Sequence, residues 1–442
     1  MADNIQLNQG IGGDVLAADD IGGAKYQRIK LVHGADGTNA GDVDIGNPLP
    51  IRVATDTVFG EVSVAQVSPL LQSDFVYGIN TRKFTTATTG SGTVSSSASL
   101  ATVSTTAATS SSGTLSSLRP LRYRAGVGAL ARFTAMFTTG ATNSQQEAGM
   151  GTSAEGLFFG YNGTAFGICR RRGSSDTWTA QSSWNVDVMD GTGPSGMTLD
   201  PAKLNVFQIR YQYLGAGAIE FFIEPPVTGR MVLVHRIQFA NNNTVTSLLN
   251  PSLPFRLHAV NTTNATALSI STGSCMLAIE GENNLAGVPW SRANTKTGIT
   301  TETSILAIRM ASTINGSSSQ VIARVASIGA AMSLNQNAIG IFRLTVNPTL
   351  GGTPAYTPFS GATADNGATI TSGQSGLSYD TAGTTVTGGT RVYATVISNA
   401  SNVNEVLADL PFALAAGEVL VASIETTSSA TVGVSLTLVE DI

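Results

Sequence analysis

Few residues in this chain have the types and spacing that catalysis needs. Among its 442 residues are three histidines and two cysteines, and only 12% of the chain is charged. General acid–base catalysis gathers His, Glu, Asp or Lys at one place. Glu220 and Glu224 would share one face of a strand, but they form a glycosidase-like pair only if a cleft holds them at the right separation. An outward polar face explains them better, and His235 fits a hydrogen-bonded core or interface position, so we expect no catalytic residue.

Three aromatic residues in the middle of the chain are candidates for contact with a glycan or another partner. Trp178 and Trp184, together with Tyr161, would form a platform for a sugar ring if they were exposed. Aromatic rings combine apolar faces with polar edges and are enriched at binding surfaces. The alternative is that both tryptophans pack beneath the loop between a hairpin and the next strand.

A run of three arginines is the second candidate for such a contact. Arg170, Arg171 and Arg172 follow an expected hairpin and would suit a phosphate or an acidic glycan. The alternative is a solvated basic turn at the exit of a strand, because charges at a rim add little affinity.

Aspartates are frequent near the N-terminus and raise the question of calcium. Their positions are Asp3, Asp14, Asp19, Asp20, Asp36, Asp42 and Asp44. An EF-hand loop needs ligands at alternate positions and a distal Glu, which residues 36–42 do not supply. Asx-turns in a Gly-rich connector are the better interpretation, so we expect neither a metal nor a cofactor.

The composition predicts an all-β protein with aliphatic cores. Hydrophobic residues make up 42% of the chain and aromatic residues 6%, with 48 glycines. A net charge of −5 argues against a nucleic-acid partner, which would select a basic face. Cys169 and Cys275 are too few for a disulfide framework, and we expect two reduced core thiols. No apolar run approaches the ~18 residues of a membrane span, and the N-terminus lacks the features of a secretory signal.

Alternating patterns predict strands from the middle of the chain to its C-terminal end. Residues 206–213 alternate strictly. The pattern places Phe207, Ile209, Tyr211 and Tyr213 on the inward face and Gln208, Arg210 and Gln212 on the outward face. Asn162-Gly163 between two apolar runs predicts a tight hairpin. The last strand, residues 432–439, alternates Val and Leu with small or polar residues. Antiparallel strands at such spacing indicate β-sandwiches of the jelly-roll type.

These patterns divide the chain into four parts. Residues 1–55 are expected to form an extended anchoring arm, because they hold too few apolar residues for a core. Residues 56–118 are rich in Ser and Thr and predict a connector with edge strands. Residues 119–285 and 293–442 predict two β-sandwich domains of usual size.

Several stretches resemble structural proteins of tailed-bacteriophage particles. They are residues 15–31, which read VLAADDIGGAKYQRIKL, then 34–37 and 47–50, the segments between 156 and 237, and the tail 434–441. The resemblance implies a virion component, such as a fibre, a baseplate-associated tail protein or a capsid decoration, and such proteins are commonly homotrimers. It supplies no catalytic residues.

The expected function is therefore assembly into a phage virion after synthesis in the host cytoplasm. The arm would dock onto other virion proteins through residues such as Tyr26, Arg28, Lys30, Asn47 and Pro48. One alternative is a capsid decoration protein, and another is a carbohydrate-binding module for host attachment. A glycan depolymerase is the least favoured hypothesis, since the chain shows no dense cluster of carboxylates.

Overall fold

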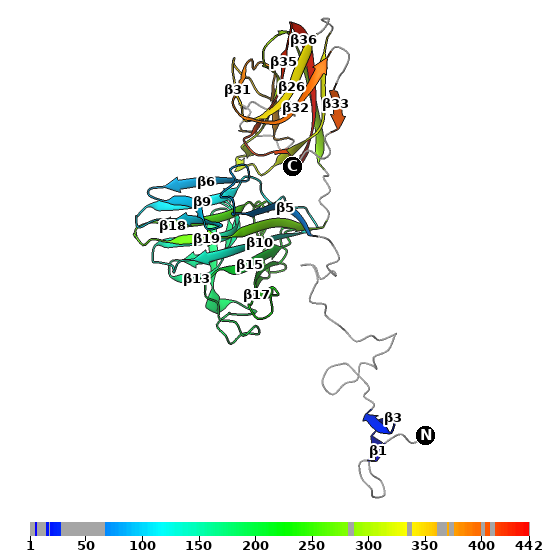
Figure 1. The fold of residues 1–442 in the computed structure, drawn as a ribbon. Helices are drawn as coiled ribbons and strands as arrows, with labels where there is room; N and C mark the ends of the chain where they lie inside the picture. Colours follow the sequence, from blue (N-terminus) through cyan, green and yellow to red (C-terminus); the bar gives the residue numbers. More distant parts are fainter. Residues whose placement is uncertain are drawn as a thin grey trace. The chain divides into compact units, whose positions relative to one another are not determined.

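The described part of the chain folds into β-strands joined by turns and loops, which confirms the predicted all-β class (Figure 1). The computed structural model describes residues 5–6, 15–16, 18–27, 67–281, 287–333, 338–359, 369–370, 375–398, 403–406 and 412–441. The one helical element among them is the short 3-10 helix η1 (Gln181–Ser183). No helix in these described ranges is long and apolar enough to cross a membrane.

The first sandwich packs a nine-stranded sheet against a seven-stranded sheet. The nine-stranded sheet runs β17 (Val232–Ile237), β16 (Ile219–Ile223), β15 (Asn205–Tyr211), β10 (Gly128–Phe137), β19 (Ser269–Thr272), β8 (Leu100–Ser104) and β7 (Thr93–Ser97), and β20 (Ser274–Glu280) joins β10 to the edge strand β5 (Val67–Asp74). The seven-stranded sheet runs β14 (Ser175–Ala180), β13 (Ala165–Arg172), β12 (Gly156–Asn162), β11 (Ser144–Gly151), β18 (Phe255–Asn261), β9 (Ser111–Ser117) and β6 (Phe84–Thr89). Every pairing within the two sheets is antiparallel.

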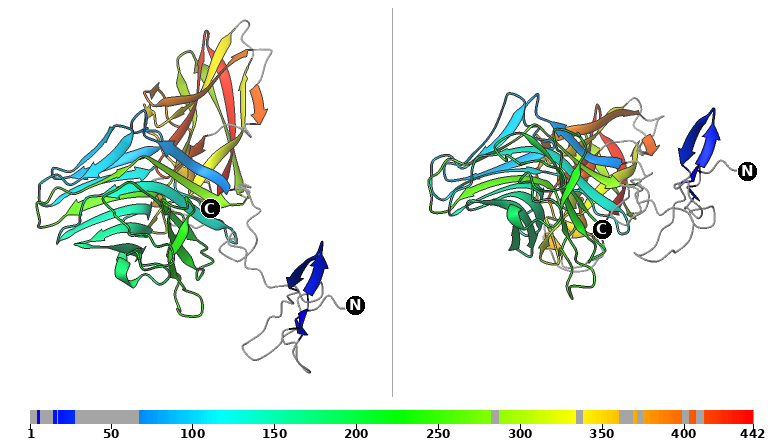
Figure 2. Two further views of the ribbon diagram at one scale, coloured as in Figure 1. Left: turned by 60° about the horizontal axis from the view of Figure 1, so that its bottom comes forward. Right: turned by 90° about the horizontal axis from the view of Figure 1, so that it is seen from below.

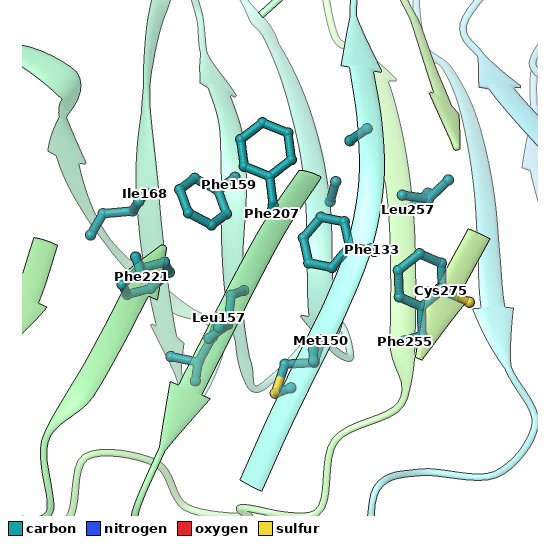
Figure 3. Close-up of a cluster of buried hydrophobic side chains, with 14 of the residues drawn as sticks. Phe133, Met150, Leu157, Phe159, Ile168, Phe207, Phe221, Phe255, Leu257 and Cys275 are labelled. Carbon is teal, nitrogen blue, oxygen red and sulfur yellow. The ribbon is translucent and has the colours of Figure 1, made fainter. Parts of the chain in front are cut away.

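Aromatic rings from both sheets fill the space between them (Figure 3). Phe159 on β12 and Phe207 on β15 have ring centroids 4.7 Å apart, and Phe133 on β10 lies 5.9 Å from Phe207. Phe207, Ile209 and Tyr211 are at most 1% exposed, which confirms the inward positions predicted for them. The outward positions differ, because Gln208 and Gln212 are 5% and 3% exposed, and Tyr213 is half-buried beyond the end of β15.

The second sandwich packs a five-stranded sheet against a six-stranded sheet. The first runs β21 (Val288–Ile299), β36 (Ala430–Asp441), β25 (Ile322–Met332) and β33 (Val403–Val406), with β34 (Ala413–Leu414) also on β25. The second runs β28 (Thr357–Pro358), β30 (Leu377–Asp380), β22 (Thr303–Met310), β35 (Val419–Thr426), β26 (Ile339–Val346) and β32 (Thr390–Ser398). Short pairs join β23 (Thr313–Ile314) to β24 (Ser317–Ser318) and β29 (Thr369–Ile370), and β27 (Thr349–Leu350) to β31 (Val386–Thr387).

The final strand buries the residues that its alternation predicts. Val432, Leu436 and Leu438 on β36 are 0% exposed, whereas the alternate residues are half-buried. The two views of Figure 2 show the strands of both sandwiches, coloured blue to green in the first and green-yellow to red in the second.

The N-terminal residues form a unit of their own, Met1–Asp56 with Gly60–Ser63. Its described parts are two short hairpins, β1 (Ile5–Gln6) with β2 (Val15–Leu16) and β3 (Ala18–Ile21) with β4 (Ala24–Gln27). Arg28, Lys30, Asn47 and Pro48, which we expected in the assembly arm, lie outside the described residues, and of Tyr26 only its place in β4 is described.

Two features differ from the sequence-based expectations. The Ser/Thr-rich stretch supplies β5 to β9, which lie in both sheets of the first sandwich and include the inner strands β8 and β9. Thr and Ser side chains in these strands form hydrogen bonds to side chains of the neighbouring strand, as Thr102 Oγ1 does with Ser271 Oγ at 2.8 Å.

The turn of the predicted hairpin is one residue further along the chain than expected. Asn162 pairs with Ala165, so the turn is formed by Gly163 and Thr164, and Gly163 has φ +61°. A glycine at the first turn position supplies the positive φ.

Candidate functional site

The loop between β5 and β6 lifts one aromatic side chain out of the first sandwich. Phe75 and Phe84 stand at its two ends, are 1% and 2% exposed, and have ring centroids 5.4 Å apart. Because both ends are anchored in the core, the segment between them must bulge outward. At its tip Tyr77 is 99% exposed.

Two side-chain-to-backbone hydrogen bonds fix the shape of this loop. Asp74 Oδ1 accepts the N–H of Val76 at 3.2 Å, and Asn80 Oδ1 accepts the N–H of Arg82 at 2.9 Å. Such Asx-turns replace regular backbone pairing where a chain changes direction. The exposed position of Tyr77 is therefore a property of the fold.

An open groove of about 820 Å³ lies beside this loop, on the face of the nine-stranded sheet that points away from the core. We call it the β5 groove. It is lined by Gln72, Ser73, Asp74, Tyr77, Gly78, Asn80, Lys83, Arg132, Phe133, Thr134, Val206, Ser274, Cys275 and Met276. Its floor follows the sheet register, in which Arg132 is opposite Met276 and Met276 is opposite Gln72.

The cation on the groove floor is held in place by an amide. Arg132 is exposed, and its Nε and Nη2 both donate to Oε1 of Gln208, at 2.9 and 2.6 Å. Gln208 is 5% exposed and sits opposite Arg132 on β15. The guanidinium group is thus oriented without being neutralised.

The three aromatic residues singled out in the sequence do not meet at a surface. Trp184 is 4% exposed and packs edge-on against Phe159 at 6.1 Å, and Tyr161 is 9% exposed within the same core cluster. Trp178 is half-buried on β14, opposite Cys169. Trp184 and Tyr161 fill the core because strands from both sheets enclose them, which local sequence does not reveal.

The arginine run is also occupied by contacts within the protein. Arg171 is 8% exposed and binds Glu147 and Asp176, with Nε 2.6 Å from Asp176 Oδ1. Arg170 donates to the carbonyl of Ser247 at 2.9 Å, and Arg172 donates to the carbonyl of Thr246 at 2.7 Å. These residues end β13 and hold a neighbouring loop, instead of forming a free basic turn.

Neither residue of the carboxylate pair lines the groove. Glu220 is 5% exposed and pairs with Arg236 Nη2 at 2.6 Å. His235 is 7% exposed, and its Nδ1 accepts the N–H of Asn185 at 3.1 Å, as a hydrogen-bonded structural histidine would. Within the described ranges no three His, Cys, Asp or Glu residues gather as metal ligands would. Cys169 and Cys275 are both buried and unpaired, as predicted.

The residues of the β5 groove were not identified from the sequence. A signal was present, because Tyr77 stands between two turn-forming residues, Asp74 and Asn80, and two basic residues follow at 82 and 83. The lining residues at positions 132–134, 206 and 274–276 come from other strands, so only the fold brings them to this loop.

The strands and sheets described above define a broad structural class, an all-β protein with sandwich domains. No family model matches the sequence, and no curated protein matches it. Similar solved structures include cellulose induced protein Cip1, with 13% identity, a TM-score of 0.32 and coverage of 47% of this chain and 96% of that chain. The CBM2 module of the evolved Dit of Lactobacillus casei BL23 phage J-1 has 11% identity, a TM-score of 0.33 and coverage of 50% and 99%.

A protein of unknown function from Shewanella oneidensis MR-1 has 14% identity, a TM-score of 0.34 and coverage of 53% and 94%. Each of these matches spans about half of this chain. Their identities and TM-scores are too low to imply a shared activity.

Proposed function

We propose that this protein binds saccharides without cleaving them and that the β5 groove is the binding site. The observation that carries the proposal is Tyr77, which is 99% exposed at the edge of an open groove lined by both polar and apolar side chains. An exposed tyrosine ring leaves a large apolar face in water, and covering that face is favourable. The C–H face of a pyranose ring is a flat apolar surface that such a ring can cover.

The polar lining of the groove matches the hydroxyl groups of a sugar. Asp74 offers acceptors only, Arg132 and Lys83 offer donors only, and the amides of Gln72 and Asn80 offer both. Hydroxyl groups donate and accept, so each of these side chains has a possible partner on a sugar ring. The groove is open, which leaves room for a polymer to continue past the site.

The lining favours binding over hydrolysis. Asp74 is the one carboxylate among the described residues of the groove. Glycosidases in general use two carboxylates that flank the scissile bond. A single exposed carboxylate supplies an acceptor for a hydroxyl group, but no acid–base pair.

Replacing Tyr77 with alanine is expected to weaken saccharide binding about 10- to 30-fold, which corresponds to about 1.4–2 kcal/mol for a central aromatic contact. Its side chain has almost no contacts to lose, so the melting temperature should not change. The test is affinity electrophoresis in gels cast with laminarin, xylan, galactan, polygalacturonate or alginate. Isothermal titration would then follow with any polymer that retards the protein.

Two variants serve as controls for this experiment. Tyr77→Phe keeps the ring and should retain most of the affinity, whereas Val227→Ala changes a residue that is 92% exposed outside the groove and should retain all of it. If no polysaccharide retards the wild-type protein, the proposal fails. It also fails if Tyr77→Ala is retarded as strongly as the wild type.

A role as a virion component is the second candidate function. It is supported by the resemblance of the sequence to phage structural proteins and by the separate N-terminal unit, Met1–Asp56 with Gly60–Ser63. In this proposal the arm attaches the protein to other virion proteins, with homotrimers as the expected assembly and saccharide binding as a host-attachment activity.

Deleting residues 1–55 tests the proposed arm. The remaining chain forms a compact unit, so the shortened protein should keep its melting temperature and its saccharide affinity. It should be absent from purified particles when it is supplied in place of the full chain, as detected by an antibody against residues 293–442. Normal incorporation of the shortened protein would rule out the arm as the attachment point.

A further inference from the structure

We infer that the β5 groove selects acidic saccharides, in which carboxylate groups meet the cations that line it. This inference rests on the proposed saccharide binding and specifies its ligand class. It is argued from three basic side chains, Arg82, Lys83 and Arg132, which gather at one edge of the first sandwich.

The basic side chains belong to one continuous depression. A second hollow of about 270 Å³ is lined by Pro69, Leu70, Leu71, Gln72, Arg82, Lys83 and Arg119. It shares Gln72 and Lys83 with the β5 groove, so the two hollows adjoin along β5. The three cations are thus displayed along one path, beside the exposed ring of Tyr77.

None of these three cations has a carboxylate partner within the described part of the chain. Lys83 Nζ donates to the carbonyl of Gln72 at 2.7 Å, and Arg132 donates to the amide of Gln208. The ion pairs that the structure describes involve other residues, and Asp74 is the one acidic residue in the two linings. The depression therefore keeps a surplus of positive charge on a chain whose net charge is −5.

The partner of Arg132 shows that its charge is left available. Two residues after Gln208 on β15, the Nε atom of Arg210 lies 2.9 Å from Oε1 of Glu280. Arg132, in contrast, donates from Nε and Nη2 to the uncharged amide oxygen of Gln208. Gln208 thus orients the guanidinium group while leaving its positive charge for a ligand. A planar guanidinium group suits a carboxylate, which it can bind through two parallel N–H donors.

The occupant favoured by these contacts is a polymer of uronic acids. Such a polymer presents a pyranose face for Tyr77, hydroxyl groups for the amides, and a carboxylate on each ring for the cations. Nucleic acid also carries regularly spaced anions, but the groove offers one exposed aromatic ring, whereas binding of single strands uses a series of stacking platforms.

The experiment compares acidic polymers with neutral forms of the same polymers. Polygalacturonate, alginate and hyaluronan are each tested beside a carboxyl-reduced derivative, in which every uronate has become a neutral sugar. At least one acidic polymer should bind, its reduced form should bind at least tenfold more weakly, and raising NaCl from 50 to 300 mM should weaken only the acidic form. Attraction between exposed charges falls with ionic strength, which gives this salt dependence.

Two variants locate the effect in the groove. Gln208→Glu keeps a partner for Arg132 and neutralises it, and should lower affinity for the acidic polymer about tenfold while leaving the reduced polymer unchanged. Because Gln208 is 5% exposed, the melting curve of the Gln208→Glu variant is measured as well. Lys83→Gln removes a positive charge from the groove at an exposed position, so it tests the same charge effect without disturbing the core. Arg230→Gln, in an exposed loop outside both hollows, is the matched control and should change nothing.

The outcomes separate this inference from the function on which it rests. Equal binding of acidic and reduced polymers would overturn the selection of acidic saccharides and leave saccharide binding in place. Absence of binding to both sets, and to the neutral polysaccharides named above, would overturn both. Binding of a dT oligonucleotide that is weakened by Lys83→Gln, with no uronate polymer bound, would overturn both in favour of nucleic acid.

Discussion

Replacing Glu147 with alanine is expected to lower the free energy of unfolding by about 3–5 kcal/mol, the range for a buried charge pair that loses one partner. Glu147 is 0% exposed on β11, where it binds Arg171 and lies 3.8 Å from Nε of Arg256. Both arginines are largely shielded from water, so removing the carboxylate takes from Arg256 the carboxylate that faces it and leaves Arg171 with Asp176 alone. Urea denaturation of the wild type and the variant measures the difference.

Asp176→Ala is the matched control for this variant. Asp176 also binds Arg171, with Nε 2.6 Å from Oδ1, but its side chain reaches solvent. Its replacement should cost about 1 kcal/mol, as is usual for a partly exposed pair. Equal losses of unfolding free energy for the two variants would show that the burial of Glu147 does not increase its contribution to stability. The saccharide affinity of the folded Glu147→Ala protein should be unchanged, since Glu147 does not line the β5 groove.

The second large effect is a loss of stability in mild acid caused by His258. His258 lies on β18 opposite Glu147, and its Nδ1 is 2.8 Å from Oγ1 of Thr114. Burial, followed by the nearby charges of Arg256 and Arg171, lowers the pKa of His258 to about 3. In the unfolded chain the imidazole recovers its ordinary pKa near 6.5.

The unfolded state therefore binds a proton between pH 6.5 and pH 3 that the folded state does not bind. The stability contributed by the neutral imidazole is complete above pH 6.5 and decreases as the pH falls, by about 1.4 kcal/mol per pH unit within this window. Below pH 3 the folded state is protonated as well, and this loss ends. We expect His258→Gln to remove that slope, which urea titrations at pH values from 4 to 7 would measure. Parallel pH profiles for the wild type and the variant would contradict the assignment.

The sequence predicts those parts of the fold whose side chains alternate clearly. The residues predicted to face inward were Phe207, Ile209 and Tyr211 on β15 and Val432, Val434, Leu436 and Leu438 on β36, and all seven are buried. Alternation is informative because a strand with one buried face repeats every two residues. Strands such as β6 (Phe84–Thr89) and β7 (Thr93–Ser97) consist mainly of Thr and Ser, so their sequence does not show which face is inward or which strand is the neighbour.

The candidate site was less accessible to sequence reasoning for a physical reason. Trp184 and Tyr77 are both aromatic residues near turns, yet one is 4% exposed and the other 99% exposed. What separates them is the environment, because Trp184 meets Phe159 from a neighbouring strand, whereas Tyr77 lies between two anchors, Phe75 and Phe84, that fill the core in its place. Such long-range contacts are decided by strand register, which no local pattern contains.

The most direct test of the account is amide hydrogen exchange of the full-length protein with and without saturating polygalacturonate. Binding in the β5 groove predicts slower exchange in residues 72–83, 130–134 and 274–276, with the rest of the first sandwich unchanged. The same experiment on Tyr77→Ala should show little slowing at equal polymer concentration. Unchanged exchange throughout the wild-type protein, or slowing only around residues 170–184, would contradict the central claim that this groove is a saccharide-binding site.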